Sequence, residues 1–295
     1  MGADLFDAYP NLLVDRSDDV LGWSLRDVCL NGPEEALTRT EHAQPALFAL
    51  SYALWLAFAS HLDEQPSGAA GHSLGEYTAL TAAGVFEYDE ALKVVAARGR
   101  AMATAADVEP SGMAALIGAS EDDATGLAAK RVAMGGDLQV ANLNAPGQIV
   151  VAGSKEDIGW LVENARTLGV RRAIPLKVAG AFHSSFMAPA SEPLAEALAD
   201  CSLGEPTFPV WANTTALPHR GDETINSLVD QVVSPVRFAD SMIAMAGAGI
   251  SVLVHVGPGD VTAGMARRTI PDATVAVVSS IEDIPTGIEA IGTMA

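Results

Sequence analysis

Cysteine and lysine are both scarce in this chain of 295 residues, which has only two cysteines, Cys29 and Cys201, and four lysines. Two cysteines cannot build a disulfide framework, and no Cys/His spacing typical of a zinc site is found. We therefore predict no bound metal and a reducing, cytoplasmic location. With 17 Lys+Arg against 37 Asp+Glu, the formal net charge is -20. Such a surface repels phosphate backbones and anionic lipids, which argues against nucleic-acid and membrane partners.

Segments typical of membrane insertion or secretion are also missing. The most apolar run, residues 46–62, is interrupted by Ser51, Tyr52, Ser60 and His61. Pro45 stands at the start of this run, as prolines do in the first turn of a helix, so the run predicts a buried core helix over residues 43–62. The opening MGADLFDAYP has neither the positive nor the apolar region of a signal peptide.

Residues 111–178 show a regular alternation of strand and helix patterns. The predicted order is strand 112–118, helix 121–133, strands 138–144 and 148–153, helix 155–169 and strand 170–178. This β-α-β-β-α-β order is typical of a ferredoxin-like unit. Outside it, uniformly apolar runs such as VLVHV at residues 252–256 suit a parallel sheet covered on both faces. The chain is therefore predicted to have a larger α/β body with a small inserted unit.

A single serine lies between two glycines in the stretch AGHSLGEYTAL, because Ser73 is the middle residue of Gly-His-Ser-Leu-Gly. A G-x-S-x-G pentapeptide places its serine on a tight turn between a strand and a helix. There the Oγ is exposed, and the N–H of the next residue, Leu74, faces developing negative charge. A serine in a glycine-rich turn also serves as a helix N-cap. The pentapeptide alone fits a nucleophile and an N-cap equally well.

A nucleophilic serine needs a base, and His183 is the best placed of the six histidines. It lies in AGAFHSS, among small residues, where the chain leaves the predicted inserted unit. His72 is next to the serine, and neighbouring side chains on a sharp turn point apart. His255 lies within VLVHV and is predicted to pack in the core. Since a loop histidine is more often solvated than catalytic, the assignment of His183 depends on that of Ser73.

Arg98 differs from Arg100 in its place on a helix predicted over residues 85–106. At about 100° per residue, Arg98 lies at the edge of the apolar stripe, whereas Arg100 points away from it. The stripe consists of Leu92, Val95, Gly99 and Met102. A guanidinium at the inward edge of a helix needs an anionic partner. Helical geometry does not decide between a structural carboxylate and a substrate carboxylate held by two hydrogen bonds.

Four segments occur together in this chain: GHSLGE at residues 71–76, RGRAM at 98–102, NLNAPGQ at 142–148 and GAFHS at 180–184. They resemble the malonyl-CoA:acyl carrier protein transacylases. The resemblance extends from about residue 2 to residue 280 and includes further landmarks at Gln44–Leu47, Asn213, Gln231, 234–238 (SPVRF) and 256–259 (VGPG). It implies an α/β-hydrolase-like body with a parallel sheet, formed by residues 1–110 and 179–295, and a ferredoxin-like subdomain of residues 111–178.

The resemblance also implies a role for each matching residue. Ser73 would be the nucleophile that accepts the acyl group, and His183 its base. The backbone carbonyl of Gln231 would orient the imidazole, and Arg98 would bind the free carboxylate of malonate. The acyl pocket would be lined by Met102, Asn142 and Phe182. The bulk of Phe182 suits malonyl, because it fills the space that the α-methyl group of methylmalonyl would need.

The activity implied is transfer of malonyl from malonyl-CoA to the phosphopantetheine thiol of acyl carrier protein, by a ping-pong route through malonyl-serine. Fatty-acid synthesis is the expected pathway, although a polyketide system uses the same chemistry. No cofactor is implied, since CoA enters as part of the substrate, and we expect a monomer. Because such carriers are acidic, docking needs a local basic patch. Candidates are Lys130-Arg131, Arg171-Arg172, Lys177 and Arg267-Arg268.

One part of the family pattern has no counterpart in this sequence. The family opens with an apolar strand and a Gly-Gln-Gly-Ser-Gln loop, and the second glutamine of that loop gives the other oxyanion N–H. This chain begins at Met1, beyond both. We expect that Met1 is an internal methionine of a longer natural protein; the alternative is a natural short form that turns over poorly. A missing oxyanion donor typically costs about 10²–10³ in rate.

Two other classes of function share some of these features. A serine hydrolase or thioesterase would have the same serine turn and histidine, but it explains neither Arg98 nor the lack of an evident acidic partner for His183. A weakly active form that only binds CoA or carrier protein is the third class. The preferred acceptor, water or thiol, separates the first two, and the absence of any acyl-serine would favour the third.

Overall fold

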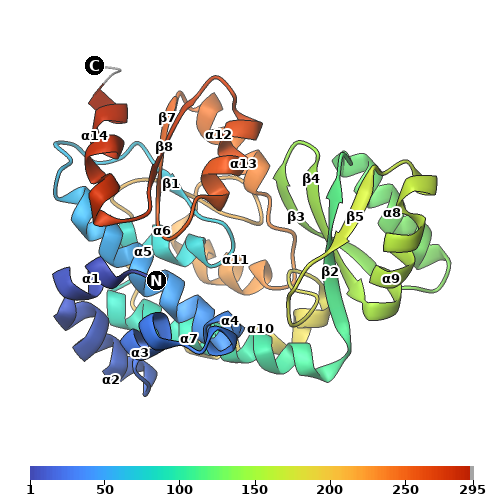
Figure 1. Cartoon of the computed structure of the whole chain (residues 1–295), viewed down its shortest axis with the longest axis horizontal. Helices are drawn as coiled ribbons and strands as arrows, with labels where there is room; N and C mark the ends of the chain where they lie inside the picture. Colours follow the sequence, from blue (N-terminus) through green and yellow to red (C-terminus); the bar gives the residue numbers. More distant parts are fainter. Residues whose placement is uncertain (293–295) are drawn as a thin grey trace.

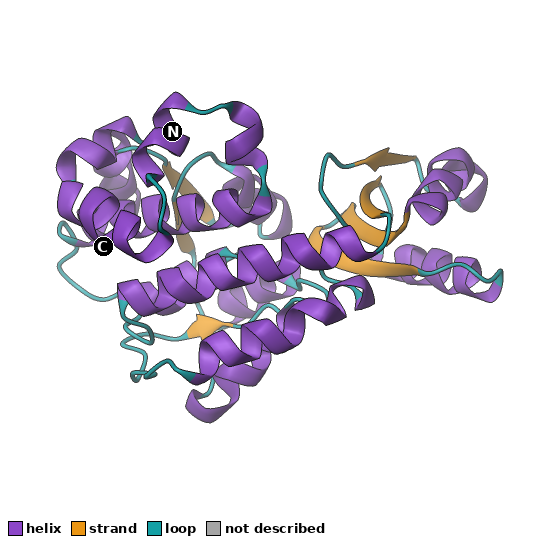
Figure 2. Ribbon diagram, turned by 90° about the horizontal axis from the view of Figure 1, so that it is seen from below, coloured by secondary structure: helices purple, strands orange, loops and turns teal. Residues whose placement is uncertain are grey.

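The computed structural model describes residues 1–292, which form two lobes joined along two long helices (Figure 1). The larger lobe, called the body here, contains both ends of the described chain. The smaller lobe contains strands β2–β5. Helix α7 (Tyr88–Val108) crosses the body and leads directly into β2, with α10 (Ala188–Ala199) packed beside it. In the view from below, α7 reaches the strands of the smaller lobe (Figure 2).

The first part of the body consists of short helical segments followed by one long helix. The short segments are α1 (Ala3–Ala8), the π-helix η1 (Asn11–Arg16), α2 (Ser17–Leu21), α3 (Leu25–Asn31) and α4 (Glu34–Thr38). The long helix, α5, extends from Thr40 to Ala59. The prediction that Pro45 opens this helix was wrong, since Pro45 lies inside it. The helix begins earlier because Thr40 and Glu41 pack against α7: a Cβ on Gly99 would lie 3.0 Å from the Cα of Glu41.

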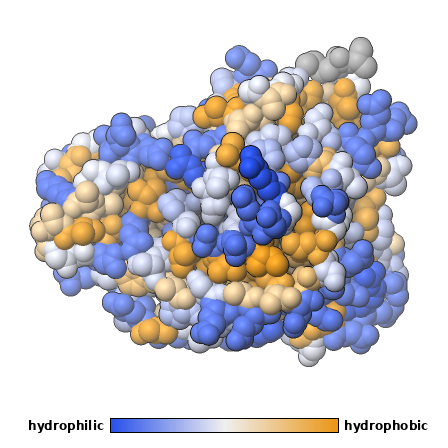
Figure 3. Space-filling view, turned by 180° about the vertical axis from the view of Figure 1, so that it is seen from behind, coloured by the Kyte–Doolittle hydropathy of each residue, from blue (hydrophilic) through white to orange (hydrophobic). Residues whose placement is uncertain are grey.

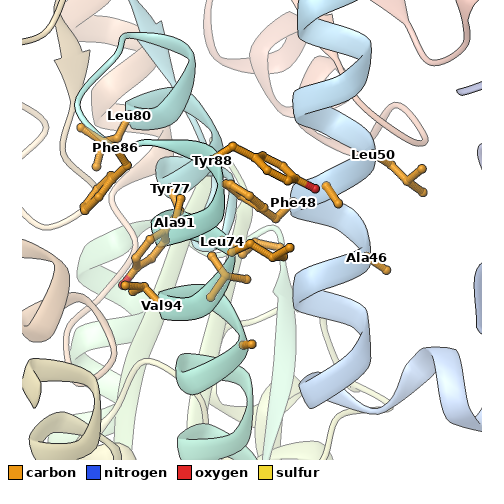
Figure 4. Packing of buried hydrophobic residues seen from close by; sticks show 14 of the residues in the cluster. Ala46, Phe48, Leu50, Leu74, Tyr77, Leu80, Phe86, Tyr88, Ala91 and Val94 are labelled. Carbon is orange, nitrogen blue, oxygen red and sulfur yellow. The ribbon is translucent and has the colours of Figure 1, made fainter. Parts of the chain in front are cut away.

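Aromatic and aliphatic side chains from α5, α6 (Gly75–Ala82) and α7 form the main core of the body (Figure 4). The rings of Phe48 and Tyr88 stack with their centroids 5.7 Å apart. Both residues are almost fully buried, and burying a side chain of this size contributes about 1.5–3 kcal/mol. Because Tyr77 and Leu80 of α6 belong to the same cluster, the helix that follows Ser73 has a fixed position.

The smaller lobe is one antiparallel sheet with two helices. Its elements are β2 (Ser111–Ile117), α8 (Glu121–Ala133), β3 (Leu138–Ala145), β4 (Gln148–Ser154), α9 (Lys155–Asn164), the 3-10 helix η2 (Ala165–Leu168) and β5 (Arg172–Pro175). The strand order is β3-β4-β2-β5. Ser120 is the N-cap of helix α8, and its side chain forms a capping box with Asp123. Gly147, with φ 72°, makes the turn between β3 and β4. The predicted order of these elements is confirmed, but the helix predicted over 155–169 ends as an α-helix at Asn164, and the strand predicted over 170–178 is limited to Arg172–Pro175.

Two separate parallel pairs of strands form the sheets of the body within residues 1–292. Strand β1 (Ala69–Ala70) pairs with β6 (Val210–Trp211), and β7 (Val252–Val256) pairs with β8 (Thr274–Val278). The prediction of parallel strands is confirmed, but the single sheet expected for the body is divided, because no ladder joins the two pairs. Strand β7 is half-buried along its whole length.

The remaining elements are η3 (Ser185–Met187), η4 (Gly221–Glu223), α11 (Thr224–Gln231), α12 (Phe238–Gly247), α13 (Val261–Thr269), η5 (Ile281–Asp283) and α14 (Ile284–Gly292). Of these, α13, α14 and η5 pack against the pair β7–β8, whereas α11 and η3 pack against α10, and α12 packs against β3. The face opposite to that of Figure 1 is largely polar, with apolar side chains in separate groups (Figure 3). Among the described helices, none is both long and apolar enough to cross a bilayer.

Candidate active site

Ser73 lies on a sharp turn between β1 and α6. The turn needs glycine at position 71, because a Cβ there would collide with the backbone of Gly75. The amide of Asn213 holds the turn from the other side: its Oδ1 accepts from Ser73 N at 2.7 Å, and its Nδ2 donates to Gly71 O at 2.7 Å. Ser73 has φ 51°, a strained conformation for a residue other than glycine. Its hydroxyl is therefore fixed at the amino end of α6, and its side chain does not cap that helix.

The backbone N–H of Leu74, the next residue, has no acceptor among residues 1–292. It belongs to the first turn of α6, where N–H groups are left unpaired and the helix dipole favours negative charge. The geometry therefore provides one donor for an oxygen atom that becomes negatively charged next to Ser73.

His183 contacts Ser73 directly, although the two residues are 110 positions apart in the sequence. Its Nε2 lies 2.8 Å from Ser73 Oγ, and its Nδ1 lies 2.8 Å from the backbone oxygen of Gln231. A carbonyl only accepts, so Nδ1 carries the proton and Nε2 is free to accept from the serine hydroxyl. His183 has φ 58°, so it and Ser73 are two of only three non-glycine residues with positive φ within residues 1–292. Such conformations cluster at functional sites.

Burial, and then the nearby charge of Arg98, lower the pKa of His183 to about 3, against the weaker opposing effect of its bond to Gln231. The imidazole is therefore neutral at neutral pH and can act as a base. In the unfolded chain the same group binds a proton below about pH 6.5. Since the unfolded state then binds more protons, His183 lowers the free energy of unfolding as the pH falls from about 6.5 towards 3.

We predict that the ring of His183 stays neutral at pH 5 in the folded protein. Replacing Arg98 by methionine removes the nearby positive charge and should raise the pKa of His183, although burial keeps it below the usual value. The Cε1 chemical shift of His183 in histidine-labelled protein, followed by NMR through a pH titration, measures both pKa values. A wild-type pKa near 6.5 would contradict this description of the site.

Arg98 is a buried cation with only neutral hydrogen-bond partners. It is 1% exposed, and its Nη1 donates to Gln44 Oε1 at 2.5 Å. Its Nη2 donates to Ser73 Oγ at 3.0 Å and to Gln231 Oε1 at 2.7 Å. Its Nε is buried without an acceptor among the described residues, and burial lowers the pKa of the guanidinium. A small anion next to Ser73 would therefore complete the bonding of this guanidinium.

The structure brings together the residues that the sequence predicted at the centre of the site: Ser73, His183, Arg98 and Gln231. The roles of the other predicted residues along the acyl group stay predictions, and the structure gives their locations. Met102 lies about one turn after Arg98, and its Sδ accepts from Gln44 at 3.5 Å. Asn142 is a buried residue of β3, and Phe182 precedes His183 and is half-buried.

The smaller lobe contacts the turn that carries Ser73. The Nε2 of His72 lies 2.7 Å from Asn144 Oδ1 of β3, so this nitrogen donates to the smaller lobe. Burial lowers the pKa of His72. Val236 exchanges backbone hydrogen bonds with the same strand, at Ala141 and Leu143. Both lobes therefore position the site.

Some functional residues had no predicted role. Gln44 and Asn213 were named only as landmarks, and Glu76 only as part of a motif. One signal could have revealed Gln44, because it is a polar residue in the apolar helix that packs against Arg98. No comparable signal exists for Asn213, since its bond to Ser73 joins residues 140 positions apart.

The comparisons with known proteins agree with this geometry. A family model described as acyl transferase domain matches residues 1–288. The sequence is 35% identical to malonyl CoA-acyl carrier protein transacylase of Bacillus subtilis, over 99% of this chain and 92% of the relative. The chain belongs to the malonyl-CoA:acyl carrier protein transacylase family.

Two solved structures of family members show the same fold. The acyl-carrier-protein S-malonyltransferase of Bartonella henselae has a TM-score of 0.93 and 34% identity, with 99% of this chain and 95% of that chain covered. A malonyl-transacylase solved in complex with the acyl carrier protein of a type II polyketide synthase has a TM-score of 0.91 and 33% identity. That match covers 97% of this chain and 94% of the other.

Proposed function

We propose that this protein moves a malonyl group from malonyl-CoA to the phosphopantetheine thiol of acyl carrier protein, through a malonyl ester of Ser73. The observation that carries the proposal is Arg98, a buried guanidinium 3.0 Å from Ser73 Oγ whose direct partners are all neutral. An acyl group with a free carboxylate supplies the anion that this guanidinium lacks. The names of the relatives support the same substrate and acceptor.

The first half-reaction acylates the serine. His183 Nε2 takes the proton from Ser73 Oγ while that oxygen attacks the thioester carbonyl of malonyl-CoA. The N–H of Leu74 donates to the carbonyl oxygen as it becomes negative. When the intermediate collapses, the C–S bond breaks and CoA leaves with the proton from His183. Gln231, through its backbone oxygen, keeps Nδ1 protonated and the ring in position throughout.

The second half-reaction reverses these roles with a different thiol. His183 takes the proton of the phosphopantetheine thiol, the sulfur attacks the malonyl ester, and Ser73 recovers its proton as the C–O bond breaks. Arg98 holds the malonate carboxylate in both halves, so the reacting carbonyl stays in place between them. We place Met102, Asn142 and Phe182 along the acyl group. CoA takes part as substrate, and the sequence of steps needs no cofactor.

We also propose a finer description of the fold. Residues 111–178 would be a ferredoxin-like subdomain, inserted in an α/β-hydrolase-like body of residues 1–110 and 179–295. The strand order β3-β4-β2-β5 and the β-α-β-β-α-β sequence support the first assignment. The strand–serine–helix turn at Ser73 and the parallel pairs support the second.

For the carrier, we set aside the predicted basic residues whose side chains already have hydrogen-bond partners. Arg267 donates to the backbone oxygen of Val275 and Arg268 to Gln148 Oε1. Arg131 already binds Asp157 and Glu156. Arg171 and Arg172, at the start of β5, and Lys177, on the segment that leads to His183, are exposed. We propose that these three residues meet the acidic carrier, because the net charge of -20 gives no general attraction to it.

The choice of acceptor tests the transferase against the hydrolase. We expect malonyl-enzyme, prepared with labelled malonyl-CoA, to pass its label to holo acyl carrier protein faster than to water. The measurement is a single-turnover assay in which malonyl carrier and free malonate are counted separately. Carrier protein without the phosphopantetheine arm is the matched control and should receive none. Free malonate as the main product, with carrier present in excess, would indicate a hydrolase.

A further inference from the structure

Glu76 is a buried carboxylate that the mechanism above does not use. It has no exposed surface and accepts three hydrogen bonds, two from the segment between β6 and η4 and one from α11. Its Oε1 accepts from His219 Nε2 at 2.6 Å and from Asn213 N at 3.2 Å. Its Oε2 accepts from Gln231 Nε2 at 2.5 Å. The side chain of His219 is itself only 4% exposed. Burying a carboxylate is costly unless it is well bonded, so this cluster has a defined geometry.

The first arm of the cluster fixes the amide of Gln231. Its Nε2 donates to Glu76 Oε2 and to Ser73 O, the latter at 3.0 Å, so its Oε1 must face Arg98. If the amide were reversed, its NH₂ would face the guanidinium and its oxygen would face the carboxylate. Both contacts would then be repulsive. The carboxylate of Glu76 therefore decides which atom of Gln231 meets Arg98, although the hydrogen bonds of Arg98 within residues 1–292 go to Gln44, Ser73 and Gln231 and not to Glu76.

The second arm reaches the turn of the nucleophile. Glu76 accepts from the backbone N–H of Asn213, and the side chain of Asn213 holds both Ser73 N and Gly71 O. One carboxylate thus connects the strained turn at Ser73 with the guanidinium of Arg98. The charge of Glu76 also opposes the effect of burial on the pKa of Arg98.

We propose that Glu76, held by His219, is a positioning residue that sets Arg98 for a substrate carboxylate and Ser73 for attack. This role rests on the proposed function, because it concerns the carboxylate of the malonyl group. It predicts that loss of the Glu76 charge slows acylation of Ser73 more for acyl-CoA substrates with a free carboxylate than for those without one. A purely structural role would reduce both in proportion to the fraction of folded protein.

The test compares acylation of Ser73 by malonyl-CoA and by acetyl-CoA, which lacks the second carboxylate. Glu76→Gln keeps the size of the side chain but replaces one of its two acceptor oxygens by an NH₂ donor and removes the charge. In one orientation its NH₂ group faces the N–H donor of Gln231, and in the other it faces those of Asn213 and His219. In both cases two donors oppose each other. We expect the malonyl-to-acetyl ratio of acylation rates to fall about tenfold. Asp157→Asn is the matched control: Asp157 is another buried carboxylate, in the smaller lobe, and its replacement should leave the ratio unchanged.

A second pair of variants keeps the test decisive if Glu76→Gln does not fold. His219→Leu removes one donor to Glu76 and should lower the ratio in the same direction, by about threefold. His219→Gln retains an N–H donor and should restore it. A malonyl-to-acetyl ratio equal to that of the wild type in Glu76→Gln overturns the positioning role alone. If Glu76→Gln does not fold, the same result in His219→Leu does so. If the wild-type chain forms acyl-serine with neither malonyl-CoA nor acetyl-CoA, both the proposed function and this role are overturned.

Discussion

Replacing His183 by asparagine is expected to slow acylation of Ser73 by about 10²–10⁴-fold, the usual contribution of a general base. The imidazole is neutral, with its Nε2 2.8 Å from Ser73 Oγ, and no other ring nitrogen is bonded to that oxygen among the described residues. Asparagine is suited to the position because it tolerates the positive φ of His183. The rate of malonyl-enzyme formation, followed by mass spectrometry after rapid quenching, measures the effect.

His255 offers a matched control for this loss. It is also a histidine whose pKa is lowered by burial, but it bonds Thr262 and Gly257 and lies outside the site. We expect His255→Asn to acylate at close to the wild-type rate per folded molecule. Equal losses in the two variants would mean that His183 acts through stability and not as the base.

Replacing Arg98 by methionine is expected to lower kcat/KM for malonyl-CoA by about 10²-fold, which corresponds to about 2.7 kcal/mol. Methionine occupies similar space but cannot hold a carboxylate. Acetyl-CoA has no carboxylate to lose, so its rate should change far less, and the preference for malonyl should disappear. Steady-state transfer assays with both donors give the two values.

Arg100 lies two residues further along α7 and is exposed, so Arg100→Met controls for loss of positive charge on the same helix. We expect that variant to retain the wild-type preference for malonyl. If Arg98→Met slowed both donors equally, Arg98 would be a structural cation of the network with Gln44 and Gln231, and the carboxylate site would have to be sought elsewhere.

Patterns of short range predicted much of the fold. Helix α8 was predicted at residues 121–133 from the pattern of the segment EDDATGLAAKRVA, and the structure has the same bounds. The turn at Ser73 was predicted from two glycines, and the structure confirms the steric need for glycine at Gly71, although a Cβ on Gly75 would meet no atom within 4 Å. The buried face of α7 was predicted from helical spacing, and Arg98 is buried while Arg100 is exposed.

Features that depend on distant contacts were not predictable in this way. Pro45 lies within α5 because the start of that helix packs on Gly99 of α7, a contact that leaves no local signal. Arg98 bonds Gln231, which lies 133 positions further along the chain. Glu76 looked like an ordinary helix residue, and only the fold shows that it bonds Asn213, Gln231 and His219. Polar networks of this kind are assembled by tertiary structure.

The most direct test of the central claim is to mix this chain with labelled malonyl-CoA, quench, and determine by mass spectrometry which peptide carries malonate. The account predicts a malonyl group on the peptide that contains Ser73. The label should be absent in Ser73→Ala and strongly reduced in His183→Asn. Malonate on another residue, or none on a folded chain, would contradict the assignment of Ser73 as the nucleophile.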